Sequence, residues 1–274
     1  MLKITALMDD TSSEHRSLCA EHGLSLWIEY DGARFMFDFG ASAHTLDNAK
    51  KLNVDVLSAD FMLCSHSHYD HSAGFSAVME SGYSGRLITG PGFWNVKYAF
   101  DGKKYTYLGA GYDSGTLEAN GVVNEVCGGT LELTKGCYVV GGFESKYSFE
   151  KIPERFVIET KDGFTADSFD DEICVVMETP RGLVVTVGCS HPGILNILSA
   201  VSSRFQKNIY AVIGGTHLIE ADEARIAVTV EEMKKMGICM AAFSHCSGEK
   251  AEGIINGDST LSDCHLAVGD TFIL

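Results

Sequence analysis

The sequence lacks the long apolar segment that a membrane-spanning helix requires. No run within the 274 residues reaches the roughly 18 apolar residues that are needed to cross a bilayer. The first residues, Met1 to Thr5, already read as a strand, with neither the basic region nor the apolar segment of a secretory signal. We therefore expect a cytoplasmic protein that has no membrane partner.

Cys-x-x-Cys pairs are also missing. The nine cysteines are odd in number and scattered along the chain, which does not suggest a disulfide framework. Reduced thiols are typical of the cytosol. The cysteines therefore agree with the expected compartment.

Basic residues are few. The chain has 21 Lys and Arg against 37 Asp and Glu, which gives a net charge of −16. Nucleic-acid backbones are held by clustered Lys and Arg, so we expect no nucleic-acid partner and instead a small-molecule substrate. Heptads and internal repeats are absent as well, so the sequence does not set an oligomeric state.

Strand and helix patterns alternate along most of the chain, as in a layered α/β protein. The length and the 45% hydrophobic content allow one large core or two fused layers. A hairpin is predicted at Asp31-Gly32, between two apolar runs. Strands are predicted at 24–30, 34–39, 60–64, 173–179, 183–188, 209–213 and 238–243, and helices at 42–52, 223–236 and after Pro192.

The segment 83–171 differs from the rest of the chain. It is rich in Gly, Tyr and Lys and has weaker periodicity. We interpret it as an insertion that carries short strands within a single domain, 1–274, and we hypothesise that it covers the substrate.

The strongest chemical signal is the run Ser-His-Ser-His-Tyr-Asp-His at 65–71, an HxHxDH motif after an apolar strand. Residues two apart on a strand end face the same way, so His66 and His68 can reach one cation. Asp70 and His71 follow as the chain turns into a helix and point to a second position. Imidazole and carboxylate suit zinc, iron or manganese, and two adjacent ions can share a hydroxide nucleophile. The run therefore predicts a two-metal site.

Four further histidines are candidates for the same site. His191 and His245 follow predicted strands, and α/β sheets present ligand sites at the carboxyl ends of their strands, so we predict that both bind metal. His217 can ligate, donate a proton to a leaving group or orient a ligand, and we favour the last two roles. His22 either takes a direct part in the site or packs in a turn or in the core.

These motifs resemble those of a known superfamily. Phe-Asp-Phe-Gly at 37–40, followed by the HxHxDH run, resembles the metallo-β-lactamase superfamily of hydrolases. Nearly the whole chain resembles the subgroup of 7,8-dihydropterin-6-methyl-4-(ribofuranosyl)aminobenzene 5'-phosphate synthases. The motifs that carry this closer likeness are Glu-His-Gly-Leu-Ser at 21–25, Gly-Cys-Ser-His-Pro-Gly at 188–193, Gly-Gly-Thr-His-Leu at 214–218 and His-Cys-Ser-Gly at 245–248.

The resemblance implies an α/β metallo-β-lactamase fold, a four-layer αββα sandwich with two mixed sheets and a Gly/Tyr-rich middle insertion. It also implies a binuclear centre of two divalent ions, with zinc preferred and iron or manganese as alternatives. Asp70 would orient the nucleophile as well as ligate, and His217 would stabilise or protonate the departing oxygen. The implied ligands are His66, His68 and His191 for the first ion and Asp70, His71 and His245 for the second.

One position departs from the pattern of the superfamily. Many two-metal members carry a bridging Asp where this chain has Cys189, which is either a thiolate ligand or a small apolar residue. Asp38 is expected to receive hydrogen bonds from the motif loop, with an ordinary strand-end turn as the alternative. We assign the acidic residues Asp167, Asp170, Asp171 and Glu172 to a solvated surface.

We therefore predict a metal-dependent hydrolase that uses a metal-bound hydroxide on a small ester, phosphoester or lactone. The first alternative is a transferase that joins a pterin diphosphate to an aminobenzene ribofuranose phosphate and releases diphosphate. The second alternative is a non-catalytic metal-binding or sensing protein. It is less consistent with the motifs, because a structural zinc site closes with four protein ligands and more than four candidates are present here.

Overall fold

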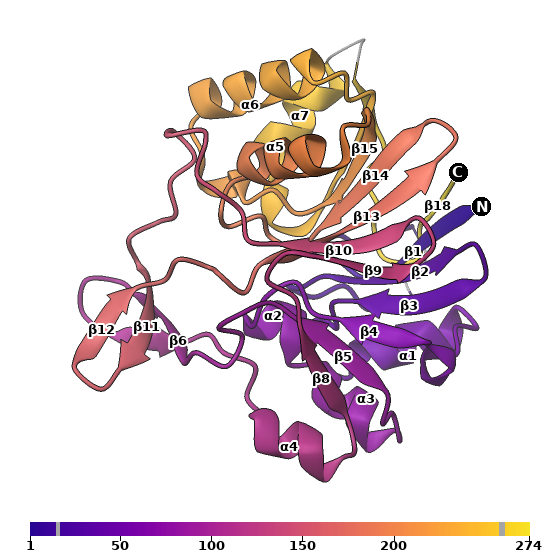
Figure 1. Ribbon diagram of the computed structural model, residues 1–274, viewed down its shortest axis with the longest axis vertical. Coiled ribbons are helices and arrows are strands. Elements are labelled where there is room, and N and C mark those ends of the chain that lie inside the picture. Colours follow the sequence, from indigo (N-terminus) through magenta and orange to yellow (C-terminus); the bar gives the residue numbers. More distant parts are fainter. Residues whose placement is uncertain (15–16, 258–260) are drawn as a thin grey trace.

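Two seven-stranded sheets pack face to face, and helices cover their outer faces (Figure 1). The structure is a computed structural model that describes residues 1–14, 17–257 and 261–274. This arrangement confirms the predicted four-layer αββα sandwich. Among the helices of the described ranges, none is both long enough and apolar enough to cross a membrane.

The first sheet is mixed. Its strands β1 to β3 are antiparallel, and β3, β4, β5 and β8 run parallel. In spatial order it contains β18 (Thr271–Ile273), β1 (Leu2–Met8), β2 (Ser25–Tyr30), β3 (Ala33–Phe37), β4 (Phe61–Leu63), β5 (Arg86–Thr89) and β8 (Val123–Val126).

The second sheet is mixed in the same way. Antiparallel pairing joins β9, β10, β13 and β14, and parallel pairing continues through β15, β16 and β17. In spatial order it contains β17 (Ser262–Asp263), β16 (Met240–Phe243), β15 (Ile209–Gly214), β14 (Gly182–Val187), β13 (Ile173–Thr179), β10 (Cys137–Gly141) and β9 (Thr130–Thr134).

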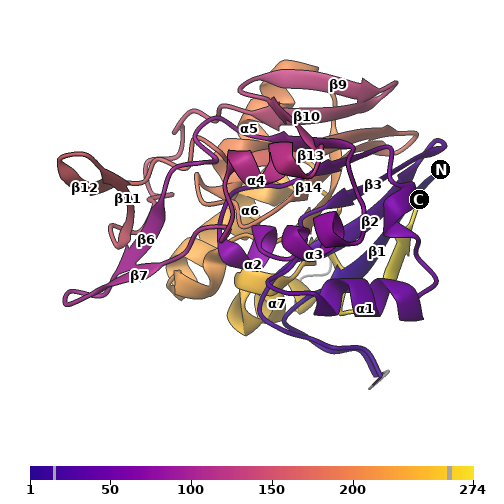
Figure 2. The ribbon, with the colours of Figure 1, turned by 90° about the horizontal axis from the view of Figure 1, so that it is seen from below.

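Helices on the two outer faces complete the layers. Figure 2 shows α1 (His44–Lys51), α2 (Tyr69–Ser72) and α3 (Phe75–Glu80) along the first sheet. The second sheet is covered by α5 (Ile194–Phe205), α6 (Glu223–Lys235) and α7 (Glu249–Asn256). The short elements are α4 (Ser114–Ala119) and the 3₁₀ turns η1 (Val56–Ser58), η2 (Leu218–Glu220) and η3 (His245–Ser247).

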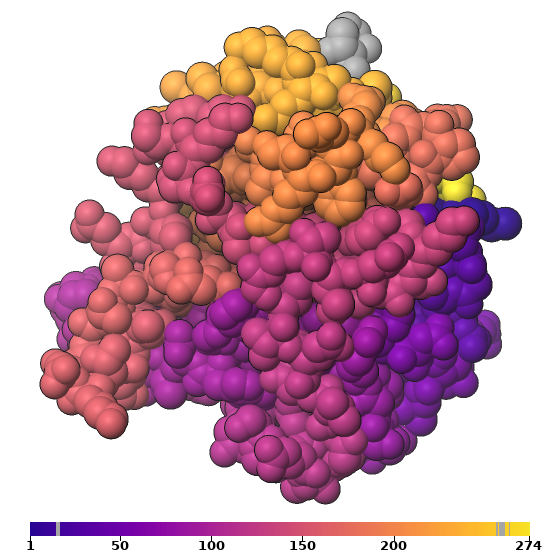
Figure 3. All heavy atoms as spheres, in the orientation of Figure 1, coloured from indigo at the N-terminus to yellow at the C-terminus, as the bar shows by residue number. Residues whose placement is uncertain are grey.

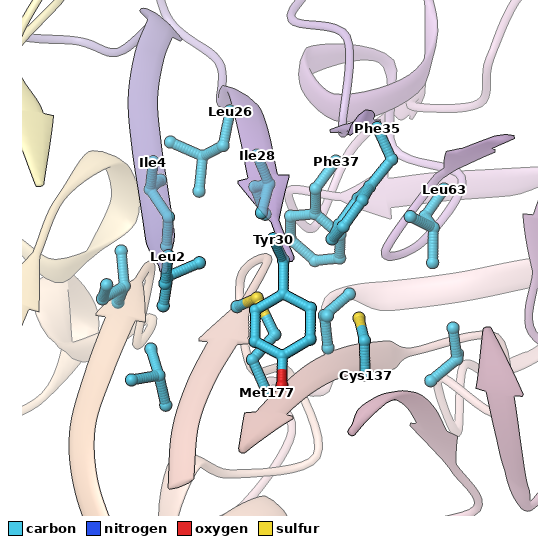
Figure 4. Packing of buried hydrophobic residues seen from close by; sticks show 14 of the residues in the cluster. Leu2, Ile4, Leu26, Ile28, Tyr30, Phe35, Phe37, Leu63, Cys137 and Met177 are labelled. Carbon is cyan, nitrogen blue, oxygen red and sulfur yellow. The ribbon is translucent and has the colours of Figure 1, made fainter. Parts of the chain in front are cut away.

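The alternation of side chains along each strand divides the apolar residues between three cores. In β3, Phe35 and Phe37 point into the core between the sheets, whereas Met36 points toward the helices. In β14, Val184 faces the first sheet and Val185 faces α5. Figure 4 shows the central core, where side chains of the two sheets meet.

The predicted hairpin is present between β2 and β3. Both Asp31 and Gly32 have positive φ angles, 46° and 94°. A two-residue turn of this kind matches the twist of the flanking strands, and Asp-Gly is suited to it. The register pairs Tyr30 with Ala33, as a two-residue loop requires.

The segment 83–171 is divided among three sheets. It gives β5 and β8 to the first sheet and β9 and β10 to the second. A third sheet of four strands projects to one side of the sandwich in Figure 2, and this part of the chain forms a protruding lobe in Figure 3. It contains β12 (Gly163–Ala166), β11 (Phe156–Thr160), β6 (Lys97–Phe100) and β7 (Tyr105–Tyr107). Only this sheet corresponds to the separate insertion that the composition suggested.

Candidate metal centre

The candidate site lies where the carboxyl ends of parallel strands from both sheets meet. The motif 65–71 follows β4 in the first sheet, and His191 and His245 follow β14 and β16 in the second. Ligand sites of α/β proteins are found at such strand ends because the loops there converge. Residues far apart in the sequence are therefore brought together at one edge of the sandwich.

The first group consists of His66, His68 and His191. Their ring centroids lie 4.7 to 4.9 Å from one another, and all three side chains are buried. Nε2 of His66, Nε2 of His68 and both ring nitrogens of His191 have no hydrogen-bond partner among the described residues. Buried polar atoms are nearly always satisfied, so this group fits a cation that is bound by its nitrogens.

Burial also sets the protonation of the first group. It holds the pKa of His66, His68 and His191 well below the ordinary value for histidine, and the neighbouring imidazoles act in the same direction. The three rings are therefore neutral near pH 7. A neutral imidazole has the free lone pair that a metal ligand needs.

The second group surrounds His71. Its Nε2 lies 3.1 Å from Nε2 of His245, 3.1 Å from Sγ of Cys189 and 3.8 Å from Oδ2 of Asp70. Nε2 of His245 lies 3.3 Å from the same Asp70 oxygen. Two imidazole nitrogens, a carboxylate oxygen and a sulfur thus face one another at a second position. The donor set fits zinc, which accepts nitrogen, oxygen and thiolate ligands.

Cys189 lies between the two groups. Its sulfur belongs to one set of candidate ligand atoms with His66 and His191 and to another with His71 and His245. Burial raises the pKa of its thiol well above the ordinary value, whereas a bound cation favours the thiolate. At the position where the resemblance leads us to expect a bridging Asp, the sulfur of Cys189 therefore lies within 4.8 Å of candidate ligand atoms in both groups.

Asp38 receives the hydrogen bonds that we expected from the motif loop. Its Oδ1 accepts a hydrogen bond from the backbone N–H of Ser65 at 2.6 Å, and its Oδ2 accepts one from Nδ1 of His71 at 2.6 Å. Because the carboxylate holds Nδ1 of His71, it turns Nε2 toward the second group.

Our assignment of the acidic stretch to a solvated surface is wrong for three of its four residues. Asp167, Asp171 and Glu172 are buried, and only Asp170 is exposed. The backbone N–H of Ser67 donates to Asp171, and those of Ser190 and His191 donate to Glu172. The stretch is buried because its carboxylates bind the two loops that carry the candidate ligands. The position of Glu172 directly before the apolar strand β13 was the sequence signal that could have indicated this burial.

A buried cation accompanies these carboxylates. Nζ of Lys97 lies 2.6 Å from Asp171 and 3.1 Å from Asp167, and it sits 4.2 Å from the ring centre of Phe169. Lys97 belongs to β6, so this ion pair joins the four-stranded sheet to the motif loop. Burial lowers the pKa of Lys97, but the two carboxylates raise it by more, so the side chain stays charged.

A cavity of about 300 Å³ opens beside both groups. His217 lines it, with its ring centroid 4.5 Å from that of His191. His22 also lines it, with Nε2 3.2 Å from Oδ2 of Asp70. The other polar side chains in its wall include Asp10, Arg155 and Glu220, which our reading of the sequence did not assign to the site. The position of Asp10 just after a strand was the sequence signal that could have placed it at the site.

An ion pair in the cavity wall connects the residue before β11 of the four-stranded sheet to η2. The Arg155 guanidinium, beside β11, is paired with Glu220 of η2, and it also lies 4.1 Å from the ring centre of Phe156. Both charged side chains are partly exposed. The four-stranded sheet therefore contributes a cationic group to the cavity wall.

No family model matches the chain, but solved structures share its fold. The crystal structure of Tm1679, described as a metal-dependent hydrolase of the beta-lactamase superfamily, has a TM-score of 0.85 and 28% identity, covering 100% of this chain and 99% of that one. Zn²⁺-bound PqqB from Methylobacterium extorquens has the same fold, with a TM-score of 0.53, 11% identity and coverage of 99% and 100%. The fold is that of the metallo-β-lactamase superfamily.

Curated relatives define the family more closely. A protein of Methanocaldococcus jannaschii named 7,8-dihydropterin-6-methyl-4-(beta-D-ribofuranosyl)-aminobenzene-5'-phosphate synthase is 32% identical, over 92% of this chain and 90% of its own length. An uncharacterized protein of the same organism, MJ0448, is 28% identical over 92% of each chain. The chain belongs to the family of this synthase within the metallo-β-lactamase superfamily.

Proposed function

We propose that the protein is a metal-dependent hydrolase with a binuclear centre that acts on a small ester, phosphoester or lactone. His66, His68 and His191 would hold one ion, and Asp70, His71 and His245 would hold the other, with Cys189 between them. The observation that carries the proposal is the convergence, beside a cavity, of buried imidazole nitrogens that have no hydrogen-bond partner among the described residues. The likeness to Tm1679, described as a metal-dependent hydrolase, supports it.

Two ions held by these residues would supply a bound water of lowered pKa and would polarise the substrate. We prefer zinc, because imidazole, carboxylate and thiolate are all present, and keep iron and manganese as alternatives. Asp70 presents Oδ2 toward the second group and so can orient the attacking group as well as ligate. His217 lines the cavity beside His191, where it can protonate the departing oxygen.

The charges in the cavity wall favour a phosphoester among these substrates. Arg155 is the one Lys or Arg that the described residues place in this wall. Guanidinium groups bind phosphate oxygens through two parallel hydrogen bonds. A substrate phosphate that displaced the Glu220 carboxylate would therefore keep Arg155 in an ion pair. A neutral lactone offers no such partner. We propose a small phosphorylated molecule as substrate, and neither a nucleic acid nor a membrane as partner.

The named relative supports a second candidate function. Its name is that of a synthase, and the likeness extends over 92% of this chain. In this alternative Arg155 and the residues of the metal centre would bind the diphosphate of a pterin substrate, and the nitrogen of an aryl amine would form a C–N bond as the C–O bond to diphosphate breaks. A non-catalytic metal-binding role is the third alternative, and we rank it last because the candidate ligands exceed four and border a cavity.

One set of assays tests the proposal. Protein purified without added metal or chelator is analysed by element-resolved mass spectrometry and then assayed against phosphoesters, esters and lactones with the same metal supplied. We expect near two ions per chain, and loss of turnover in His68→Ala and Asp70→Ala. His44→Ala serves as the control, because His44 is half exposed and outside the cavity wall.

The outcome separates the candidate functions. Water-dependent product release supports hydrolysis, whereas diphosphate release that requires an aryl-amine acceptor supports transfer. Full activity in His68→Ala or Asp70→Ala would contradict both enzymatic proposals. Metal binding without turnover of any substrate would favour the sensing alternative.

A further inference from the structure

Asp10 connects two histidines in the wall of the cavity. Its Oδ2 lies 2.8 Å from Nδ1 of His22, and its Oδ1 lies 2.6 Å from Nδ1 of His245. Asp10 follows β1 and His22 precedes β2, so both come from the first sheet, whereas His245 follows β16 of the second. One carboxylate therefore fixes the orientation of imidazoles from both halves of the sandwich.

This orientation directs both imidazoles toward Asp70. With Nδ1 held by Asp10, Nε2 of His22 lies 3.2 Å and Nε2 of His245 lies 3.3 Å from the same oxygen, Oδ2 of Asp70. The two ring centroids are 4.8 Å apart. Metal-bound histidines usually have this arrangement: a carboxylate is hydrogen-bonded to one ring nitrogen, and the second ring nitrogen points toward the other metal ligands.

We propose that His22 is an additional ligand of the second ion and that Asp10 is the carboxylate that orients both His22 and His245. This inference rests on the binuclear centre of the proposed function. It gives the second ion one more nitrogen donor in a chain whose strand-end carboxylate is replaced by Cys189. The second position then has donors from His22, Asp70, His71 and His245, beside the sulfur.

A purely structural role for His22 does not explain its place. Its side chain is 56% exposed, so it contributes little to packing, and it lies in the cavity wall. His44 is a useful contrast. It is 54% exposed and its Nδ1 lies 3.1 Å from a carboxylate, Glu21, but it lies outside the cavity wall. A half-exposed histidine held by a carboxylate thus occurs at two places in the described chain, and only His22 also faces Asp70.

The test is a titration of metal-free protein with Zn²⁺ against a chromophoric chelator, which resolves the affinity of each ion. We expect His22→Ala to keep the first ion at wild-type affinity and to bind the second about 100-fold more weakly. Asp10→Asn keeps the shape of the side chain and should weaken the second ion by about 10-fold to 100-fold. His44→Ala should match the wild type at both ions.

A second readout separates ligation from a general loss of structure. In Co²⁺-loaded protein, the visible absorption of the second ion should change in His22→Ala and stay unchanged in His44→Ala. Thermal unfolding of the metal-free variants checks that each one folds. Two ions in the wild type with unchanged affinity and absorption in His22→Ala would overturn this inference and leave the proposed function intact. Fewer than two ions in the wild type would instead overturn the binuclear centre itself, and this inference with it.

Discussion

Asp38 and His71 are joined by a hydrogen bond of 2.6 Å between two fully buried side chains. Nδ1 of His71 donates to Oδ2 of Asp38, so Nε2 of His71 is left to face Cys189 and His245. The same carboxylate accepts a hydrogen bond from the backbone of Ser65. Asp38 therefore fixes both the motif loop and the histidine at its end.

Replacing Asp38 with Asn should weaken the second metal ion. The Asn amide keeps the shape of the side chain but loses the negative charge that makes the His71 imidazole a stronger metal ligand. We therefore expect a decrease in Zn²⁺ affinity of about 10-fold to 100-fold. Competitive titration with a chelator measures it. Asp31→Asn, in the exposed hairpin turn, is the control. Equal affinity in Asp38→Asn and the wild type would show that Asp38 supports only the loop.

Replacing Cys189 with Ser should remove a thiolate from the centre. Co²⁺-loaded wild-type protein is expected to show a sulfur-to-cobalt charge-transfer band in the near ultraviolet, and Cys189→Ser should lack it. Cys239→Ser changes an exposed thiol and should keep the band. If the band is absent from the wild type or persists in Cys189→Ser, the sulfur of Cys189 is not a ligand.

Replacing Arg155 with Met should weaken the binding of inorganic phosphate to the metal-loaded protein. Loss of a charge-assisted hydrogen bond of about 1.5 kcal/mol corresponds to about 10-fold in Kd, which calorimetry can measure. Stability should change by less than about 1 kcal/mol, because the pair with Glu220 is partly exposed. Arg181→Met, in an exposed turn, is the control. Unchanged phosphate affinity would assign Arg155 to a surface ion pair only.

Replacing Lys97 with Met should destabilise the protein strongly. The side chain of Lys97 is 1% exposed, and its removal leaves the carboxylates of Asp171 and Asp167 buried without their cation. Breaking a buried pair in this way costs about 3–5 kcal/mol. Urea unfolding of the metal-free protein measures it, with the exposed Lys104→Met as the control. A cost below 1 kcal/mol would show that the two carboxylates accept protons instead.

His265 should make stability depend on pH. Its ring nitrogens lie 3.5 Å from Asp9 and 3.4 Å from Glu252, and these two carboxylates, Asp9 first, raise the pKa of His265 to about 10 from 6.5. Because the folded-state pKa is the higher one, the stabilisation is complete below pH 6.5 and is lost as the pH rises toward 10.

The variant His265→Gln tests this dependence. Since both ion-pair distances are long, we expect it to be less stable than the wild type by about 1 kcal/mol at pH 6 and equally stable near pH 10. Thermal unfolding of both proteins across this range gives the difference. A difference that stays constant with pH would show that His265 acts through packing and its hydrogen bond to Phe243.

Short-range patterns in the sequence determined much of the fold. The strand predicted at 173–179 is β13, and the helix predicted at 223–236 is α6, which ends one residue earlier. The Asp31-Gly32 turn fixed its hairpin. These features depend on side-chain periodicity and local backbone preference, which act between neighbours in the chain. The motif 65–71 likewise carries its ligand types and spacing within seven residues.

The tertiary structure alone decided which distant residues share the site. Asp10 and His245 are 235 residues apart and meet because strand ends of the two sheets face each other. The acidic residues before β13 are buried because Lys97 and backbone N–H groups reach them, and no local pattern records such partners. The packing of the two sheets also placed Cys189 between the two groups of histidines. Distances between strands depend on how whole sheets pack. Local sequence therefore indicated which residue types could bind metal, whereas the packing of the sheets decided which of them lie together.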